Sequence, residues 1–279
     1  MAFSSNNIQK GIKRMPRKVV IYGPPKLGKS TLAGSTKNAL LIPTEDRVAH
    51  IDCDKTPVLK SWEEKMEIFN FLLDEKNPHT YTRVVFDTID WLEPLIHKAA
   101  IDNINSGKEK SKHAKSITDD FCKETAFSKG LKFHAVNQWK KFLHNCDILR
   151  EHGIDVILIA HHQVVKVDPP VGDAYDKYAM KIDKHALAVI EEWADVIAFY
   201  DKNIFVTTEE SGIGQKSGKA VANAANSRTL HLSGENPAMI NGNSFGLTDS
   251  PVPLESCSEI MEWILTGPYD NNKTKKGDK

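Results

Sequence analysis

A glycine-rich segment near the N-terminus combines residue types that bind phosphate groups. Residues 23–31, GPPKLGKST, have the spacing G-x-x-x-x-G-K-[ST] and follow the β-branched run KVVIY. Glycines at this spacing allow a tight loop whose backbone N–H groups converge on phosphate oxygens, while the lysine contacts the β- and γ-phosphates. The hydroxyl of the next residue completes the shell of a Mg²⁺ ion. The motif therefore predicts a site for ATP and Mg²⁺ made by Gly23, Pro24, Pro25, Lys26, Leu27, Gly28, Lys29, Ser30 and Thr31.

Two carboxylates are placed to complete such a site. Asp87 directly follows the apolar run RVVF, where a carboxylate that binds Mg²⁺ together with Ser30 is expected. Glu45 follows the strand expected after the loop, and it is our candidate for activating the attacking water. A solvated loop carboxylate is the alternative for Glu45, and Asp46 is a second candidate for its role. Asp90 has the spacing of a helix-capping residue, which predicts a structural role.

A histidine follows the most hydrophobic stretch of the chain, IDVILIA at 154–160. At the end of that strand, His161 is expected to contact the γ-phosphate and to report its loss to the segment that follows. A histidine with a purely structural role at the strand end is the alternative. Zinc binding by His161 and His162 is disfavoured, because neighbouring side chains diverge and no third ligand stands nearby.

The elements that must position these residues alternate between strands and helices. We expect strands at 18–22, 40–42, 83–86, 154–160, 195–200 and 203–208, and helices from 29 and at 61–75, 91–104, 133–152, 184–193 and 254–265. This alternation predicts an α/β fold with a mostly parallel central sheet and helices on both faces. Ligands bind beyond the carboxyl ends of such strands, which is where the candidate residues lie.

The composition is that of an ordinary globular protein. Its 37 basic and 37 acidic residues balance, so overall charge does not indicate a polyanionic partner. Four scattered cysteines suit a reducing compartment, and no stretch approaches the ~20 apolar residues of a membrane span. We expect a cytoplasmic protein with no membrane partner, a basic mobile leader at 1–17, one ATPase domain at 18–266 and a disordered tail at 267–279.

The order of these features resembles the RecA-core ATPases. The P-loop, a glutamate after the second strand, the run VVFDTID and the stretch LREHGIDVILIAHH follow one another in that order. From about Lys18 to Phe245 the chain is more narrowly similar to the small phage recombination proteins of the Sak type, which promote single-strand annealing. The similarity includes PPVGDAYDKYAMKIDKHALAVIEEWADVIAFY.

This resemblance implies a RecA-like fold and ATP-dependent binding of single-stranded DNA in phage recombination or repair. It also implies self-assembly into a ring or filament, with Glu45 as the catalytic glutamate and His161 as the sensor. A phage or host single-strand binding protein is a further expected partner, and the cytoplasm would be that of a bacterial host.

Residues 163–183 are expected to form a polar loop at the same edge of the sheet. Cations beside aromatic rings are typical of single-strand binding, although aspartates among them also fit a solvated loop. The candidate DNA-binding residues are Lys166, Tyr175, Lys177, Tyr178 and Lys181. Lys216, Lys219 and Arg228 follow the last predicted strands and are candidates to contact the γ-phosphate of a neighbouring subunit, which requires an oligomer.

Two other functions remain open at this point. One is a kinase built on the same P-loop, and the other is a nucleotide-binding module of a replication or packaging complex. A kinase usually has an arginine-rich lid over the phosphates, whereas residues 105–130, expected to form a surface excursion, contain lysines but no arginine.

Overall fold

The computed structural model describes residues 11–202, 204–211, 215–222 and 228–268. Within them the centre of the molecule is a ten-stranded sheet with the order β12–β10–β7–β1–β5–β4–β2–β3, to which β6 is added at β5 and β11 at β7. The path from β7 to β3 is parallel, and β10 and β12 join it antiparallel. The strands are β1 (Lys18–Gly23), β2 (Ala39–Pro43), β3 (Asp54–Lys55), β4 (Arg83–Asp87), β5 (Asp155–Val167), β6 (Tyr175–Met180), β7 (Val196–Lys202), β10 (Arg228–His231), β11 (Gly242–Asn243) and β12 (Ser250–Pro251).

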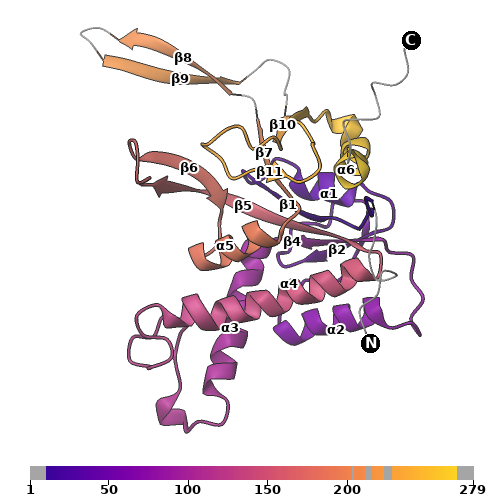
Figure 1. Ribbon diagram of the computed structural model, residues 1–279, viewed down its shortest axis with the longest axis vertical. Coiled ribbons are helices and arrows are strands. Elements are labelled where there is room, and N and C mark those ends of the chain that lie inside the picture. Colours follow the sequence, from indigo (N-terminus) through magenta and orange to yellow (C-terminus); the bar gives the residue numbers. More distant parts are fainter. Residues whose placement is uncertain (1–10, 203, 212–214, 223–227, 269–279) are drawn as a thin grey trace.

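Helices cover both faces of this sheet (Figure 1). They are α1 (Lys29–Gly34), α2 (Trp62–Leu73), α3 (Ile89–Asn105), α4 (Val136–Glu151), α5 (Lys184–Trp193) and α6 (Cys257–Thr266), with 3₁₀ turns at Lys110–Lys112 and Leu254–Ser256 and a π turn at Gly130–Ala135. The predicted α/β architecture is confirmed, and α5 has the predicted bounds. No helix of the described residues has the length and apolar character that crossing a bilayer requires.

The central strands are buried from both sides, which explains their continuous apolar sequences. In β1, Val19 and Ile21 belong to the core cluster that contains residues of α1 and α6. Val20 and Tyr22 belong to the cluster that contains residues of α2, α3, α4 and α5. Alternate side chains of a strand point to opposite faces, so a strand between two helical layers needs apolar residues at every position. The P-loop strand is thereby fixed on both faces by the core.

One strand separates the P-loop strand from the strand of Asp87. β5 pairs in parallel with β1 on one side and with β4 on the other, and its His161 lies opposite Gly23. Because parallel strands end at the same edge, the residues that follow β1, β2, β4 and the first part of β5 gather there.

Two strands form a separate ribbon. β8 (Ile204–Ser211) and β9 (Gln215–Ala222) pair antiparallel with each other, and Figure 1 shows the ribbon extending away from the main sheet. Lys216 and Lys219, predicted to contact a neighbour's nucleotide, lie on β9.

The end of the predicted leader packs on the body of the protein. Arg17 is fully buried, and its guanidinium donates to carbonyl groups of Ile264 and Gly267 at the end of α6. Arg14 donates to another carbonyl group there, at 2.9 Å. These arginines meet carbonyl groups that helix geometry leaves unpaired, so the C-terminal end of the predicted leader contacts α6. The mobility of residues 1–17 stays a prediction. Residues 1–10 and 269–279 lie outside the described residues.

Candidate active site

The P-loop connects β1 to α1 through a backbone that only glycine fits easily. Gly28 has φ 95° and precedes the first residue of α1, and the space beside Gly23 is closed by Tyr200. A Cβ atom on Gly23 would lie 2.0 Å from the Tyr200 carbonyl oxygen. The two motif glycines are thus required by backbone conformation and by close packing, which leaves the N–H groups of the loop available to an anion.

Lys29 is the buried cation of the loop. Its Nζ donates to the carbonyl oxygens of Gly23 (3.0 Å) and Pro24 (2.7 Å). Burial lowers the pKa of Lys29 to about 8, an effect opposed by the charges of Asp87, Asp90 and Glu45. The side chain is therefore held charged at neutral pH, in a position where phosphate oxygens can replace the carbonyl groups.

Asp87 ends β4 and is 2% exposed. Burial raises the pKa of its carboxyl group, while a hydrogen bond from the Ser30 hydroxyl and the charge of Lys29 lower it. The pair offers two hard oxygen ligands, and Mg²⁺ typically takes one or two protein oxygens together with phosphate oxygens and water. The donor set therefore fits the Mg²⁺ site predicted at Ser30 and Asp87.

Two threonines join the end of β2 to the end of β4. The backbone N–H of Thr44 donates to the carbonyl oxygen of Asp87 at 2.7 Å. Its hydroxyl donates to the Thr88 carbonyl oxygen (2.7 Å) and accepts from the Thr88 N–H (2.8 Å). Because Glu45 is the next residue after Thr44, these buried bonds place it beside Asp87.

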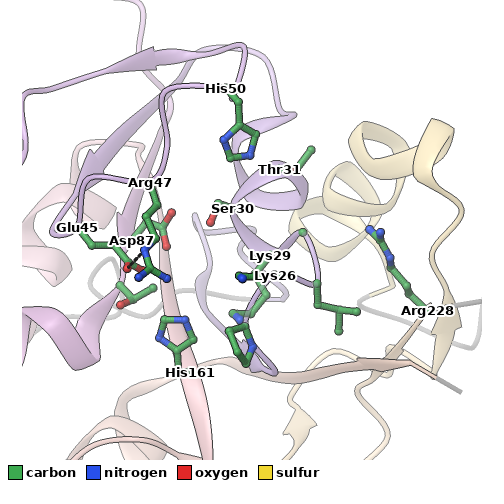
Figure 2. Close-up of a pocket in the computed structure, with 14 residues that line it drawn as sticks. Lys26, Lys29, Ser30, Thr31, Glu45, Arg47, His50, Asp87, His161 and Arg228 are labelled. Carbon is green, nitrogen blue, oxygen red and sulfur yellow. Dashed lines mark ion pairs between the residues drawn. The ribbon is translucent and has the colours of Figure 1, made fainter. Parts of the chain in front are cut away.

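Glu45 lies in the pocket with a side chain that is 12% exposed. Its charge contributes to the raised pKa of Asp87, so the two carboxylates interact. Arg47 Nε is 3.6 Å from Glu45 Oε2, and Figure 2 shows this pair facing the P-loop. A carboxylate in this position can accept a proton from water.

His161 is held by a carboxylate from α3. Its backbone N–H donates to Asp90 Oδ1 (3.0 Å), and its Nδ1 lies 2.9 Å from Asp90 Oδ2. Burial alone would raise the pKa of Asp90, but the hydrogen bonds from His161 outweigh it and lower that pKa. An ionised Asp90 favours the proton on Nδ1 and fixes the orientation of the ring.

The predicted capping role of Asp90 is therefore wrong. Thr88 is the N-cap residue of α3, and no side chain caps the helix. Glu93, the other half of the predicted capping box, accepts instead from the backbone N–H of Asp183 at 3.0 Å. Both carboxylates are used in contacts with segments that are distant in sequence.

A cavity of about 380 Å³ brings most of the predicted residues together. Its wall includes Glu45, Asp87 and His161, with P-loop residues 25–31. Gly23 and Pro24 do not line the cavity, but their carbonyl oxygens accept hydrogen bonds from Lys29 Nζ. Three basic residues that also line the cavity were not assigned to it from the sequence: Arg47, His50 and Arg228. Arg47 and His50 follow Glu45 by two and five positions. Their closeness to Glu45 in the sequence could have indicated that they line the same cavity.

Arg228 lies at the P-loop of its own chain. Its Nη1 is 2.9 Å from the position that a Cβ atom on Gly28 would occupy. Figure 2 shows it on the other side of the loop from Glu45, Asp87 and His161. β10 pairs with β7, which brings Arg228 to the edge of its own sheet. Contact of Arg228 with a neighbour's nucleotide stays a prediction.

The segment predicted as a polar loop, 163–183, is a β-hairpin. β5 continues past His161 and pairs antiparallel with β6. Residues opposite one another in a hairpin share a face, and neighbours along a strand alternate between faces. Lys166 and Tyr178 therefore lie on one face of the hairpin, and Tyr175 and Lys177 lie on the other. The candidate DNA-binding residues are thus divided between two surfaces.

Two of these candidates have structural contacts. The Tyr178 ring stacks on Phe199, with centroids 4.9 Å apart, and packs against the core. The exposed Lys181 donates its backbone N–H to the carbonyl oxygen of His161 at 2.8 Å. The hairpin is therefore bonded directly to the predicted sensor, and DNA binding by its residues stays a prediction.

A match to a family model relates this chain to known proteins. A family model described as an AAA domain matches residues 15–234, whereas comparison with curated protein sequences gave no match. Among solved structures the chain is similar to a KaiC-like protein of Pyrococcus horikoshii (11% identity, TM-score 0.35) and to the flagellar accessory protein FlaH of Methanocaldococcus jannaschii (10% identity, TM-score 0.31). Each likeness covers 78% of both chains. Because the family match spans most of the chain and includes the P-loop, this protein belongs to the AAA-domain family and is a nucleotide-binding P-loop ATPase domain.

Proposed function

We propose that this protein hydrolyses Mg-ATP to drive an action on single-stranded DNA, as a phage protein of the annealing and recombination type. The observation that carries the ATPase half is the convergence of Lys29, Asp87 and Glu45 on one cavity. The DNA half is supported by the resemblance of the sequence to the Sak-type phage proteins. That resemblance also supports a ring or filament of identical subunits.

Each group in the cavity has a distinct task in this proposal. Lys29 binds the β- and γ-phosphates, and Ser30 with Asp87 would hold the Mg²⁺, which neutralises phosphate charge when bound. Glu45 orients the water whose oxygen attacks the γ-phosphorus, and it accepts the proton that this water loses. The bond from the γ-phosphorus to the bridging oxygen breaks, and the electron pair leaves with ADP.

His161 connects hydrolysis to the hairpin. Asp90 fixes the ring through Nδ1, which leaves Nε2 for the γ-phosphate. The carbonyl group of the same residue accepts from Lys181 at the end of β6. A change at His161 on loss of the γ-phosphate would therefore act on both ends of the hairpin.

Steady-state ATP hydrolysis with and without a single-stranded oligonucleotide tests the proposal. We expect turnover that rises on addition of the single strand and does not rise with the matching duplex. Phosphate transfer to an added nucleotide would instead indicate a kinase. Binding of ATP without turnover would indicate a nucleotide-binding module of a larger complex.

A further inference from the structure

The connection between α3 and α4 exposes three aromatic rings to solvent. In this segment, residues 106–135, the exposed fractions are 103% for Phe121, 89% for Phe127 and 51% for Phe133. Nine large apolar side chains are exposed among the described residues, and these phenylalanines are three of them. Exposed apolar side chains gathered in one segment indicate an interaction surface.

The α3–α4 connection is an ordered scaffold. Ala114, Ile117 and Cys122 form a small core with the end of α3. The buried Thr125 hydroxyl donates to the carbonyl oxygen of Asp119 at 2.5 Å. Contacts this tight hold the surrounding turns in one conformation, so the phenylalanines are presented from a fixed frame.

The backbone of the connection is strained where it turns Phe127 outward. Phe127 and Ser128 are consecutive non-glycine residues in the left-handed region, with φ 54° and 61°. The next turn brings Gly130 so close to Ile117 that a Cβ atom would lie 1.9 Å from its carbonyl oxygen. This strain lowers the stability of the folded state, and exposing an apolar ring does not compensate for it. Backbone strain of this kind is typical of binding sites.

The charges around the rings are mostly positive. Two of the nearby acids are paired with lysine, since Glu124 lies 2.7 Å from Lys108 and Glu109 lies 3.1 Å from Lys112. Asp119 accepts from backbone N–H groups. The lysines with no carboxylate partner among the described residues are Lys110, Lys115, Lys123, Lys129 and Lys132. Asp120, next to Phe121, is a further exposed acid, but with seven lysines against four acids the connection is net positive. Lys132 Nζ lies 5.4 Å from the ring centroid of Phe133.

Lysines alternating with aromatic rings match a polymer that alternates phosphates with flat bases. Single strands meet this description, because every base has a face on which a ring can stack. A bilayer would be served equally by aliphatic side chains, but the large apolar side chains exposed in the connection are all phenylalanines. The chemistry therefore favours single-stranded nucleic acid.

We propose that the α3–α4 connection is the base-stacking platform for single-stranded nucleic acid, with Phe121, Phe127 and Phe133 as its aromatic contacts. This inference rests on the proposed action on single strands and moves the main contact away from the β5–β6 hairpin. The platform lies at the far end of α3 from Asp87 and Asp90, about 25 Å along a helix of 17 residues. Figure 1 shows this end of α3 and the start of α4 away from the P-loop helix α1.

Fluorescence polarisation with a labelled oligothymidylate tests the platform. In the full-length protein, Phe121→Leu with Phe127→Leu keeps apolar surface but removes the aromatic faces. We expect affinity to fall by about 5- to 150-fold for each base that stacks, with an unchanged salt dependence. Replacing Lys123, Lys129 and Lys132 with glutamine should instead flatten the log–log salt slope by about 0.7 for each lost phosphate contact. Phe71 is an exposed phenylalanine on α2, so Phe71→Leu is the matched control. This variant should bind the oligothymidylate as tightly as the wild type does.

The outcomes separate this inference from the proposed function. Loss of binding in the leucine variant with unchanged basal ATP hydrolysis supports the platform. Full binding by that variant, with loss on replacing Lys166, Lys177 and Lys181, would overturn the platform and leave the proposed function standing. A wild type that ignores the oligonucleotide but binds phosphatidylserine vesicles would overturn both the platform and the DNA half of the function.

Discussion

Asp87 and Glu45 are both carboxylates at one edge of the sheet, but their surroundings differ. Asp87 is buried, accepts from Ser30 and has a raised pKa. Glu45 is more accessible and lies beside the cation of Arg47. A buried carboxylate next to a hydroxyl suits a metal ion, whereas a carboxylate at the cavity wall suits a water molecule.

Neutral replacements of these two residues should therefore fail in different ways. Glu45→Gln removes a proton acceptor without removing a phosphate ligand, so Mg-ATP binding should remain while turnover falls about 10²–10⁴-fold. Asp87→Asn should weaken Mg²⁺ and nucleotide binding together. Nucleotide titrations at several Mg²⁺ concentrations check the difference, and identical titrations for the two variants would contradict the separate roles.

The site residues that could be predicted from the sequence are those marked by a pattern in the adjacent residues. The P-loop glycines and Asp87 could be located because each follows a short apolar strand. The contact between His161 and Asp90 could not, since it joins residues 71 positions apart in sequence. The position of Arg228 beside its own P-loop could not be predicted either, because it depends on a long-range strand pairing.

Among the elements, α2 contains a lysine that is completely buried. Lys65 Nζ lies 3.3 Å from the ring centroid of Trp62, and it has no hydrogen-bond partner among the described residues. Burial lowers the pKa of Lys65 to about 7. The face of the Trp62 ring favours the ammonium form. A buried lysine of this kind costs stability whenever it is charged.

Lys65→Met should therefore stabilise the protein in a pH-dependent way. Below about pH 7, the pKa of Lys65 in the folded protein, the folded wild type has a charged lysine in its core. Between about pH 7 and 10.5, Lys65 is neutral in the folded state but protonated in the unfolded state. Wild-type stability attributable to Lys65 thus rises with pH over this window. We expect a gain on the order of 1–4 kcal/mol at about pH 6 and a smaller one at about pH 9. Urea unfolding of both proteins measures it, and an equal gain at both pH values would rule out the titration.

The β5–β6 hairpin shows where element prediction from sequence stops. The buried part of β5 is a continuous apolar run and was predicted, but its outer part alternates polar and apolar residues. Such a ribbon has no continuous buried face, and its pairing depends on β6, for example Gln163 opposite Ala179. Local periodicity does not contain that register, so the loop prediction for 163–183 was wrong.

Across the whole molecule, the sheet provides one edge at which the ends of β1, β2 and β4 meet the middle of β5. The glycine loop after β1, Glu45 after β2, Asp87 at the end of β4 and His161 within β5 all face one cavity. The α/β class was predictable because central strands and covering helices have different apolar periods. The added strands β10, β11 and β12 were not, since they are short and depend on pairing within the sheet.

ATP hydrolysis by Lys29→Ala, measured beside the wild type, tests the assignment of the ATP site most directly. Lys29 has a pKa lowered by burial, so its removal should not weaken the fold, and circular dichroism and thermal unfolding serve as the control. We expect a folded variant without measurable turnover, because the cation proposed to bind the β- and γ-phosphates is gone. Hydrolysis by a pure Lys29→Ala preparation at the wild-type rate would contradict the assignment of the site.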